Sequence, residues 1–181
     1  MKTGLIIIDL INDFVTGELG NPRAEAVVPK VLRILSMARD NGIPVTYVTD
    51  AHLPGIDHEF EVWGRHAEAG TSGSEIVPEL KPLKNEYHLY KRRYSAFFAT
   101  GLDALLEELK VDTVILTGVL TNICIQHTAA DAFFRGYKIR VPTDCVDALS
   151  DDEQAHSLDF MKRMYNVDLT DSETILEELE S

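Results

Sequence analysis

This 181-residue sequence has no long apolar run, few cysteines and no excess of basic residues. Its only two cysteines are Cys124 and Cys145, so we do not expect a disulfide framework, and a reducing compartment is the default. No segment approaches the roughly 18 consecutive apolar residues that span a bilayer. Acidic residues outnumber basic ones by 30 to 17, and the net charge of −13 argues against nucleic acid or an anionic membrane as a partner.

Features of a signal peptide are also missing from the N-terminal sequence. The apolar run 5–8 is short, is followed by Asp9, and has no small-residue cleavage site. We therefore expect a cytoplasmic protein. With 45% hydrophobic and 26% charged residues, the chain has a globular composition, and its length predicts a single domain over residues 1–181.

Short β-branched runs alternate with helical patterns along most of the chain. The expected strands cover residues 5–8, 44–49, 87–91, 111–116, 138–141 and 167–169. The expected helices cover residues 29–40, 102–109, 122–135, 152–164 and 175–179, with start signals at Pro29, Thr100, Thr121, Asp151 and Ser172. This alternation predicts an α/β fold of three layers, α/β/α, around a doubly wound, mainly parallel six-stranded sheet. Residues 51–85 have no strong period and are expected to form a functional excursion with short helical pieces.

Reactive side chains follow three of the expected strands: Asp9, Lys91 and Cys124. In parallel sheets, ligands bind beyond the carboxyl ends of the strands, so we expect these side chains to meet there. A carboxylate can take a proton from a thiol, a lysine can lower the thiol pKa, and amides at a helix start can stabilise an oxyanion. Each residue also has a structural explanation: a turn residue, a solvated basic run and a small buried cysteine. The sequence alone leaves both explanations open.

A second group of candidate residues could bind a metal ion: Asp50, His52, Glu59 and His66. Two imidazoles with one or two carboxylates suit Zn²⁺, Mn²⁺ or Fe²⁺. The Asp-x-His step places both side chains on the same face of an extended segment. Composition alone favours a histidine-bearing surface loop instead, and Asp57 or His58 could replace Glu59 as a ligand.

Three ordered motifs, at residues 9–14, 91–97 and 118–131, resemble those of the isochorismatase-like cysteine hydrolase superfamily. The resemblance covers the chain from about residue 4 to 165 and implies that Asp9, Lys91 and Cys124 form a catalytic triad. It also implies a cis peptide bond between Val119 and Leu120, and an oxyanion hole made by the amides of Leu120 and Cys124. His127, one turn after the cysteine, is the alternative base, but the family pattern assigns that role to Asp9.

The segment after the second strand is similar to the metal loop of nicotinamidases. Its matching pieces are Asp50–His52, Trp63–His66 and Gly70–Gly73. The resemblance implies that Asp50, His52 and His66 bind a divalent metal, first of all Zn²⁺ and otherwise Mn²⁺ or Fe²⁺, with Glu59 as a further ligand found in some nicotinamidases. The loop between the two histidines is shorter than in many nicotinamidases, and Ala67 stands where several of them carry a cysteine.

The resemblance implies a nicotinamidase, which hydrolyses nicotinamide to nicotinate and ammonia through a cysteine thioester and so serves NAD salvage, a branch of pyridine nucleotide biosynthesis. The expected partners are a small amide substrate and further copies of the chain, in a dimer or tetramer. The aromatic residues Phe14, Trp63 and Tyr94 are expected to hold a flat ring. The alternatives are a superfamily amidohydrolase that acts on a carbamoyl or ureido compound, and a non-catalytic metal- or ligand-binding protein. We expect Cys145, Phe133 and Phe134 to be packed in the core.

Overall fold

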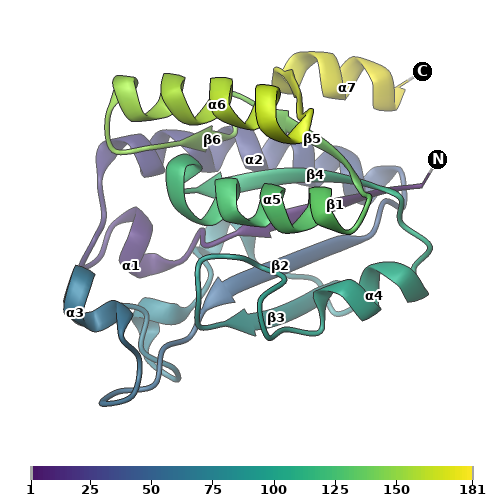
Figure 1. Cartoon of the computed structure of the whole chain (residues 1–181). Helices are drawn as coiled ribbons and strands as arrows, with labels where there is room; N and C mark the ends of the chain where they lie inside the picture. The colour runs from purple at the N-terminus through teal and green to yellow at the C-terminus, as the bar shows by residue number, and fades with distance from the viewer. Residues whose placement is uncertain (1, 181) are drawn as a thin grey trace.

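A parallel sheet forms the centre of the computed structural model, which describes residues 2–180 (Figure 1). Its strands are β1 (Thr3–Ile8), β2 (Val45–Asp50), β3 (Tyr87–Lys91), β4 (Thr113–Val119), β5 (Lys138–Pro142), β6 (Val146–Asp147) and β7 (Asp168–Thr170). The strand order is β3-β2-β1-β4-β5-β7, the short β6 pairs with β4, and every pair is parallel. The predicted fold is confirmed, and β6 is the one strand that the sequence pattern missed.

Helices connect these strands and cover the sheet. They are α1 (Asn12–Val15), α2 (Pro22–Asp40), α3 (Glu59–Trp63), α4 (Leu102–Glu108), α5 (Gln126–Phe134), α6 (Asp151–Tyr165) and α7 (Ser172–Glu180). Two short 3₁₀ turns, Ser72–Ser74 and Pro78–Leu80, and a π-helical turn, Thr121–Ile125, complete the described elements. Within the described residues, no helix combines the length and apolar composition needed to cross a membrane.

Both faces of the sheet are apolar, which is why the strands read as continuous hydrophobic runs. Successive strand side chains point to opposite faces. Leu5 and Ile7 of β1 join a core cluster with α2 and α7, whereas Ile6 and Ile8 join a second cluster with α4, α5 and α6. The three predicted layers are therefore α2 and α7, the sheet, and α4 to α6 (Figure 1).

The first long helix, α2, begins earlier than predicted. Its N-cap is Asn21, whose side chain accepts hydrogen bonds from the amides of Arg23 and Ala24, and Pro22 occupies the first helical position. Pro29 therefore lies inside the helix, and the prediction that it starts the helix was wrong. An interior proline lowers helix propensity, but burial of Val27, Val28 and Val31 on the core face outweighs that local preference.

All four predicted helix caps were wrong by one residue: Thr100 precedes the cap Gly101 of α4, Ser172 is already the first residue of α7, and the other two are as follows. Before the π-helical turn, the extended cap position is occupied by Leu120, and Thr121 already lies in the turn with a buried hydroxyl that has no hydrogen-bond partner among the described residues. A cap residue must be non-helical to reach the first amides. At α6 the cap is Ser150, which accepts from the amide of Glu153, rather than Asp151.

The end of α5 carries aromatic side chains that the sequence analysis assigned to the core. Phe133 is 45% exposed and Phe134 is 72% exposed. Both rings lie against Tyr165 at the end of α6, with centroid separations of 5.8 and 6.4 Å. They extend beyond the face of α5 that covers the sheet, where Ala129 and Ala132 are fully buried. Cys145 is fully buried, as expected.

Gly118, near the end of β4, lies against the backbone of β1 with no room for a side chain. Its φ is +115°, and a Cβ atom added there would lie 1.9 Å from the carbonyl oxygen of Ile8. The left-handed backbone and the contact with a main-chain atom both require glycine at this position. Asp9, a residue of the candidate site, follows Ile8 directly, so this close backbone contact lies next to the site.

Gly118→Ala should lower the free energy of unfolding by about 3 kcal/mol, because the added methyl group meets backbone and the residue keeps a positive φ. The measurement is urea unfolding followed by circular dichroism. Gly101→Ala is the matched control, since a Cβ there has no neighbour within 4 Å, and its cost should not exceed about 1 kcal/mol. Equal stability losses in the two variants would contradict the argument.

Candidate active site

The candidate residues meet where the parallel strands end. Asp9 follows β1, Asp50 closes β2, Lys91 closes β3, and β4 leads into the turn that carries Cys124. Asp50 and Lys91 are register partners across the β2–β3 pair. Helices α1 and α3 lie beyond the same ends of the strands (Figure 1). The sheet topology therefore gathers residues that are up to 115 positions apart in the sequence (124 − 9 = 115).

The three residues of the predicted triad lie in one buried cluster. The Nζ atom of Lys91 is 2.7 Å from Oδ2 of Asp9 and 3.5 Å from Sγ of Cys124. The same Nζ is 2.7 Å from Oδ1 of Asp50. Because Lys91 is only 1% exposed, it is not part of a solvated basic face.

Backbone geometry fixes the two acidic members of this cluster. Asp9 has a positive φ of 56°, and its Oδ1 accepts a 2.8 Å hydrogen bond from the amide of Asp50. On the other side of the cluster, the peptide bond between Val119 and Leu120 is cis, as the resemblance implied. The assignment of Asp9, Lys91 and Cys124 as catalytic residues remains a prediction, and their arrangement meets its geometric requirement.

Burial controls the protonation of the thiol and its neighbour. Burial raises the pKa of Cys124 well above its ordinary value, and the lysine only partly opposes this effect. The sequence-based expectation of a lowered thiol pKa was therefore wrong, because it left out the cost of burying a thiolate. Burial and the nearby Asp50 raise the pKa of Asp9 to about 6, against the opposing effect of Lys91. The site thus holds a neutral thiol beside a carboxylate, with oxygen and sulfur atoms within 4.8 Å of one another.

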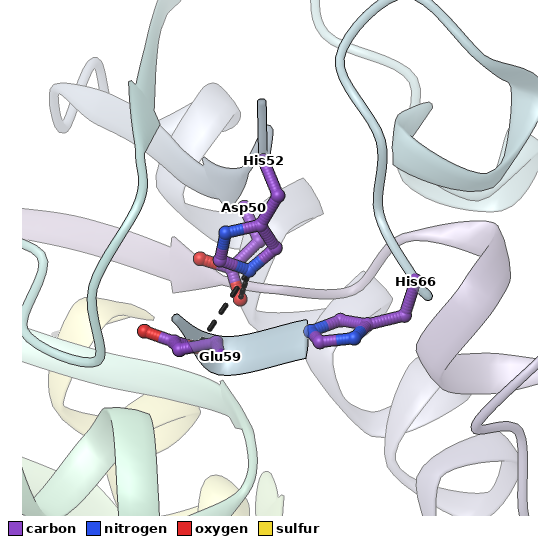
Figure 2. A group of neighbouring side chains, drawn as sticks. All are labelled: Asp50, His52, Glu59 and His66. Atoms are coloured by element: carbon purple, nitrogen blue, oxygen red, sulfur yellow. Dashed lines mark ion pairs between the residues drawn. The ribbon is translucent and has the colours of Figure 1, made fainter. Parts of the chain in front are cut away.

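The four predicted metal ligands form a second cluster, which Figure 2 shows: Asp50, His52, Glu59 and His66. All four are buried, and one potential ligand atom from each lies within 4.8 Å of the others. The Nε2 atom of His52 is 3.5 Å from Asp50 and 3.6 Å from Glu59, and it has no hydrogen-bond partner among the described residues. A buried imidazole nitrogen aimed at two carboxylates fits a divalent cation, and this mixed nitrogen and oxygen donor set suits Zn²⁺, Mn²⁺ or Fe²⁺.

Electrostatic crowding in this cluster also fits a cation. Burial and the negative charge of Asp50 raise the pKa of Glu59 to about 7. Burial lowers the pKa of His66, which favours the neutral imidazole that metals bind. For His52, burial opposes the charged form, but the neighbouring Asp50 raises its pKa overall. A positive charge between these side chains would relieve the repulsion between the two carboxylates.

The two neighbours of Glu59 that the sequence left open as ligands do not join the cluster. The side chain of His58 is 81% exposed. Asp57 has a fully buried carboxylate, but it faces the Nδ1 side of His52 at 3.3 Å and pairs with Arg92 and Arg93. Hydrogen bonding from Arg92 holds the pKa of Asp57 well below its ordinary value. Glu59 is therefore the carboxylate that completes the cluster around Asp50.

A cavity of about 120 Å³ opens between the two clusters. Its lining comprises Phe14, Leu19, Asn21, Asp50, Glu59, Trp63, His66, Tyr94, Val119, Leu120, Ile123, Cys124 and Leu149. The three predicted aromatic residues are present, and the indole of Trp63 donates a 3.2 Å hydrogen bond to the hydroxyl of Tyr94. The cavity is smaller than the roughly 300–1,000 Å³ typical of sites for drug-sized ligands, so it suits a small molecule.

Four residues of this lining were missed by the sequence analysis: Leu19, Asn21, Ile123 and Leu149. None of the four carries a reactive group. Ile123 lies inside the motif at residues 118–131, whereas the other three lie outside every motif, and only the folded chain brings them to the cavity. Leu120 and Cys124 both line the cavity, as their predicted oxyanion role requires, and that role remains a prediction. His127 is exposed and its Nδ1 lies 2.7 Å from the carbonyl oxygen of Ile123, outside this lining.

Comparisons with known proteins find chains that are similar over nearly the whole length of this one. The family model described as Isochorismatase domain matches residues 3–174. The chain is 33% identical over 181 residues to YaaI of Bacillus subtilis, an uncharacterized isochorismatase family protein, with 96% of each chain covered.

Solved structures extend the comparison. N-carbamoylsarcosine amidase from Thermoplasma acidophilum has 39% identity and a TM-score of 0.89, covering 95% of this chain and 97% of that one. Pyrazinamidase/nicotinamidase from Streptococcus mutans has 34% identity and a TM-score of 0.87, covering 93% and 99%. A pyrazinamidase from Pyrococcus horikoshii, solved in complex with zinc, has 25% identity and a TM-score of 0.87, covering 94% and 99%.

Lys91→Met should lower the free energy of unfolding of the metal-free protein by about 3–5 kcal/mol, because it leaves the buried carboxylates of Asp9 and Asp50 without their shared cation. Thermal and urea unfolding measure this loss. Lys162→Met, at an exposed position of α6, is the control and should change stability by no more than about 0.5 kcal/mol. If the Lys91 variant is as stable as the control, the ion pairs of Lys91 do not contribute to the stability of the fold.

Proposed function

The chain belongs to the isochorismatase family, and we propose that it is a cysteine-dependent amidohydrolase that converts nicotinamide and water to nicotinate and ammonia. The observation that carries this proposal is the shared cavity. Cys124 lines it together with Asp50, Glu59 and His66, so a small ring can contact the thiol and the metal-ligand cluster at once. The similarity to the pyrazinamidase/nicotinamidase of Streptococcus mutans supports the same assignment.

We propose that Asp50, His52, Glu59 and His66 hold a divalent cation, with Zn²⁺ as the first candidate and Mn²⁺ or Fe²⁺ as alternatives. When bound, the cation supplies an electrophilic position for the pyridine nitrogen of the substrate, which directs the carboxamide toward the thiol. The orphaned Nε2 atom of His52 supports this ligand set. The zinc complex of the Pyrococcus horikoshii pyrazinamidase supports zinc as the first metal to test.

In the proposed reaction, the carboxylate of Asp9 takes the proton of the Cys124 thiol as sulfur attacks the amide carbon. The amides of Leu120 and Cys124 stabilise the oxyanion of the tetrahedral intermediate. Asp9 then gives its proton to the departing nitrogen, ammonia leaves, and a thioester remains. A water molecule, deprotonated by Asp9, attacks the thioester; Asp9 then returns the proton to the departing sulfur, which restores the Cys124 thiol and frees the carboxylic acid. Lys91 keeps Asp9 fixed between these steps through its 2.7 Å ion pair.

The raised pKa of Cys124 makes the base essential in this scheme. A free thiolate is disfavoured by burial, so the proton must move to Asp9 as the sulfur–carbon bond forms. With its pKa raised to about 6, Asp9 is still ionised at neutral pH and is basic enough to accept the proton.

The charged side chains of the cavity, taken apart from the proposed cation, favour a neutral substrate. Asp50 and Glu59 contribute carboxylates to the described lining, and no lysine or arginine belongs to it. A substrate that carries its own carboxylate, such as N-carbamoylsarcosine, would find no cationic side chain to pair with in this lining. Nicotinamide and pyrazinamide are neutral, and both have a ring nitrogen meta to the carboxamide, which the proposed cation would bind while the carboxamide meets the thiol.

Other properties expected from the sequence stay proposals. These are a single domain over residues 1–181, a cytoplasmic location, a role in NAD salvage, and a homo-oligomer of two or four chains. The exposed aromatic side chains Phe98, Phe133 and Phe134 are compatible with association between copies. Analytical ultracentrifugation of the purified protein tests the oligomeric state directly.

The purified protein reconstituted with Zn²⁺, Mn²⁺ or Fe²⁺ should release ammonia from nicotinamide and from pyrazinamide. Cys124→Ala should reduce the rate by at least about 10⁴-fold, because it removes the nucleophile. Prolonged chelation should abolish most of the activity, and added metal should restore it. A coupled ammonia assay follows the reaction.

Cys145→Ala is the matched control for the nucleophile, since it removes the other buried thiol outside the cavity and should keep the activity. Absence of ammonia release with all three metals would refute the nicotinamide assignment. Activity that survives Cys124→Ala would refute the cysteine mechanism.

The value of kcat/KM for nicotinamide should exceed that for N-carbamoylsarcosine by at least about 100-fold, because the anionic compound finds no lysine or arginine in the cavity lining and has no ring nitrogen to direct at the proposed cation. Competition between the two compounds in one reaction, followed by liquid chromatography, gives this ratio directly. A preference for N-carbamoylsarcosine would instead support the carbamoyl-amide alternative, which the similarity to the Thermoplasma acidophilum enzyme raises.

A further inference from the structure

Asp57 is a buried carboxylate that belongs to neither of the two clusters. It lies in the segment between β2 and α3, and its side chain is 0% exposed. Both of its oxygens accept hydrogen bonds from Nε of Arg92 at 3.0 Å, and Oδ2 accepts a 2.7 Å bond from the amide of Leu53. The carboxylate is thus held in one orientation by partners on two different segments of the chain.

This carboxylate faces the imidazole of His52. Its Oδ2 is 3.3 Å from Nδ1 of that ring. An ionised carboxylate can only accept a hydrogen bond, so the contact places a proton on Nδ1. In the neutral ring, Nε2 then carries the lone pair, and it is Nε2 that faces Asp50 at 3.5 Å and Glu59 at 3.6 Å. The Asp57 contact therefore selects the tautomer that can bind a metal within the cluster.

The anchor of Asp57 comes from the end of strand β3. Arg92 and Arg93 directly follow Lys91, and both pair with Asp57. Within the run 91–93, the lysine therefore pairs with Asp9 and Asp50, and the two arginines pair with Asp57. One strand end supports the candidate triad on one side and the His52 segment on the other.

We infer that Asp57, held by Arg92 and Arg93, is a positioning residue that fixes the ring of His52 with Nε2 directed at the metal site. This inference rests on the proposed metal site and adds a residue outside its ligand set. Carboxylates that accept from the second nitrogen of a metal-binding histidine set both its tautomer and its orientation. Asp57 acts through His52 and does not touch the ion or the substrate.

The test compares metal affinity in three purified proteins: the unmodified chain, Asp57→Asn and Glu86→Gln. Glu86 is the matched control, because its side chain is only 3% exposed, pairs with Arg39 at 2.7 Å, and accepts a 2.7 Å bond from the amide of Leu83. It lies at the opposite end of β3. The two substitutions therefore remove comparable buried charges, but only one of them contacts a proposed ligand.

Chelator competition measures the dissociation constants of Zn²⁺ and Co²⁺, and the visible spectrum of bound Co²⁺ reports the ligand geometry. Asp57→Asn should weaken binding by about 10–100-fold and alter the Co²⁺ spectrum at saturation, whereas Glu86→Gln should change neither. Circular dichroism of the metal-free proteins checks their folding. If Asp57→Asn does not fold, Arg92→Gln keeps the carboxylate but removes its closest anchor, and should weaken binding by about 10-fold.

The outcomes separate this inference from the proposed function. Metal binding by the unmodified chain that is unchanged in Asp57→Asn, or equally weakened in Glu86→Gln, would overturn the positioning role alone. Absence of metal binding in the unmodified chain would overturn both the metal site and the positioning role. Ammonia release from nicotinamide is measured separately and does not enter either comparison.

Discussion

The ammonium group of Lys91 is the contact on which the candidate site depends. It lies 2.7 Å from a carboxylate oxygen of Asp9 and 2.7 Å from one of Asp50, and all three side chains are almost fully buried. A carboxylate taken out of water costs several kcal/mol unless a cation and hydrogen bonds compensate it. Two such carboxylates can coexist here because one lysine, extended along the end of β3, pairs with both.

Asp50 connects this ion pair to the metal-ligand cluster. One of its oxygens accepts from Lys91, and the other faces His52. Burial and the charge of Asp50 together raise the pKa of Asp9, the proposed base, and the pKa of Glu59, a proposed ligand. The two clusters are therefore electrostatically one unit. Because Asp50 contacts both clusters, a cation at the metal site would also change the electrostatic environment of Asp9, the proposed base. The cavity is lined by residues of both clusters.

Much of this arrangement was predictable because the strands of a parallel sheet all end on the same side, whatever their order in the sheet. A β-branched run followed by Asp9 or by Lys91 indicates a strand that ends in a reactive group, and all such ends lie at one edge. Helix starts were less predictable. The start of α2 is set by another local signal, the Asn21 cap with Pro22, and the helix continues through Pro29 because its core face is buried. Before the π-helical turn, the extended cap position falls on Leu120 and not on Thr121. The prediction that Phe133 and Phe134 are buried was wrong because residue type alone does not show that this end of α5 extends past the sheet.

By itself, the sequence determined the layered fold and the strand-end positions of Asp9, Lys91 and Cys124, since these depend on local periodicity. It also indicated the four candidate metal ligands, through the resemblance to the metal loop of nicotinamidases. Only the tertiary structure decided that Lys91 is buried, that the pKa of Cys124 is raised, and that Asp57 faces the Nδ1 side of His52 instead of serving as a further ligand. Burial and charge interactions are sums over neighbours distant in sequence, and no spacing rule contains them.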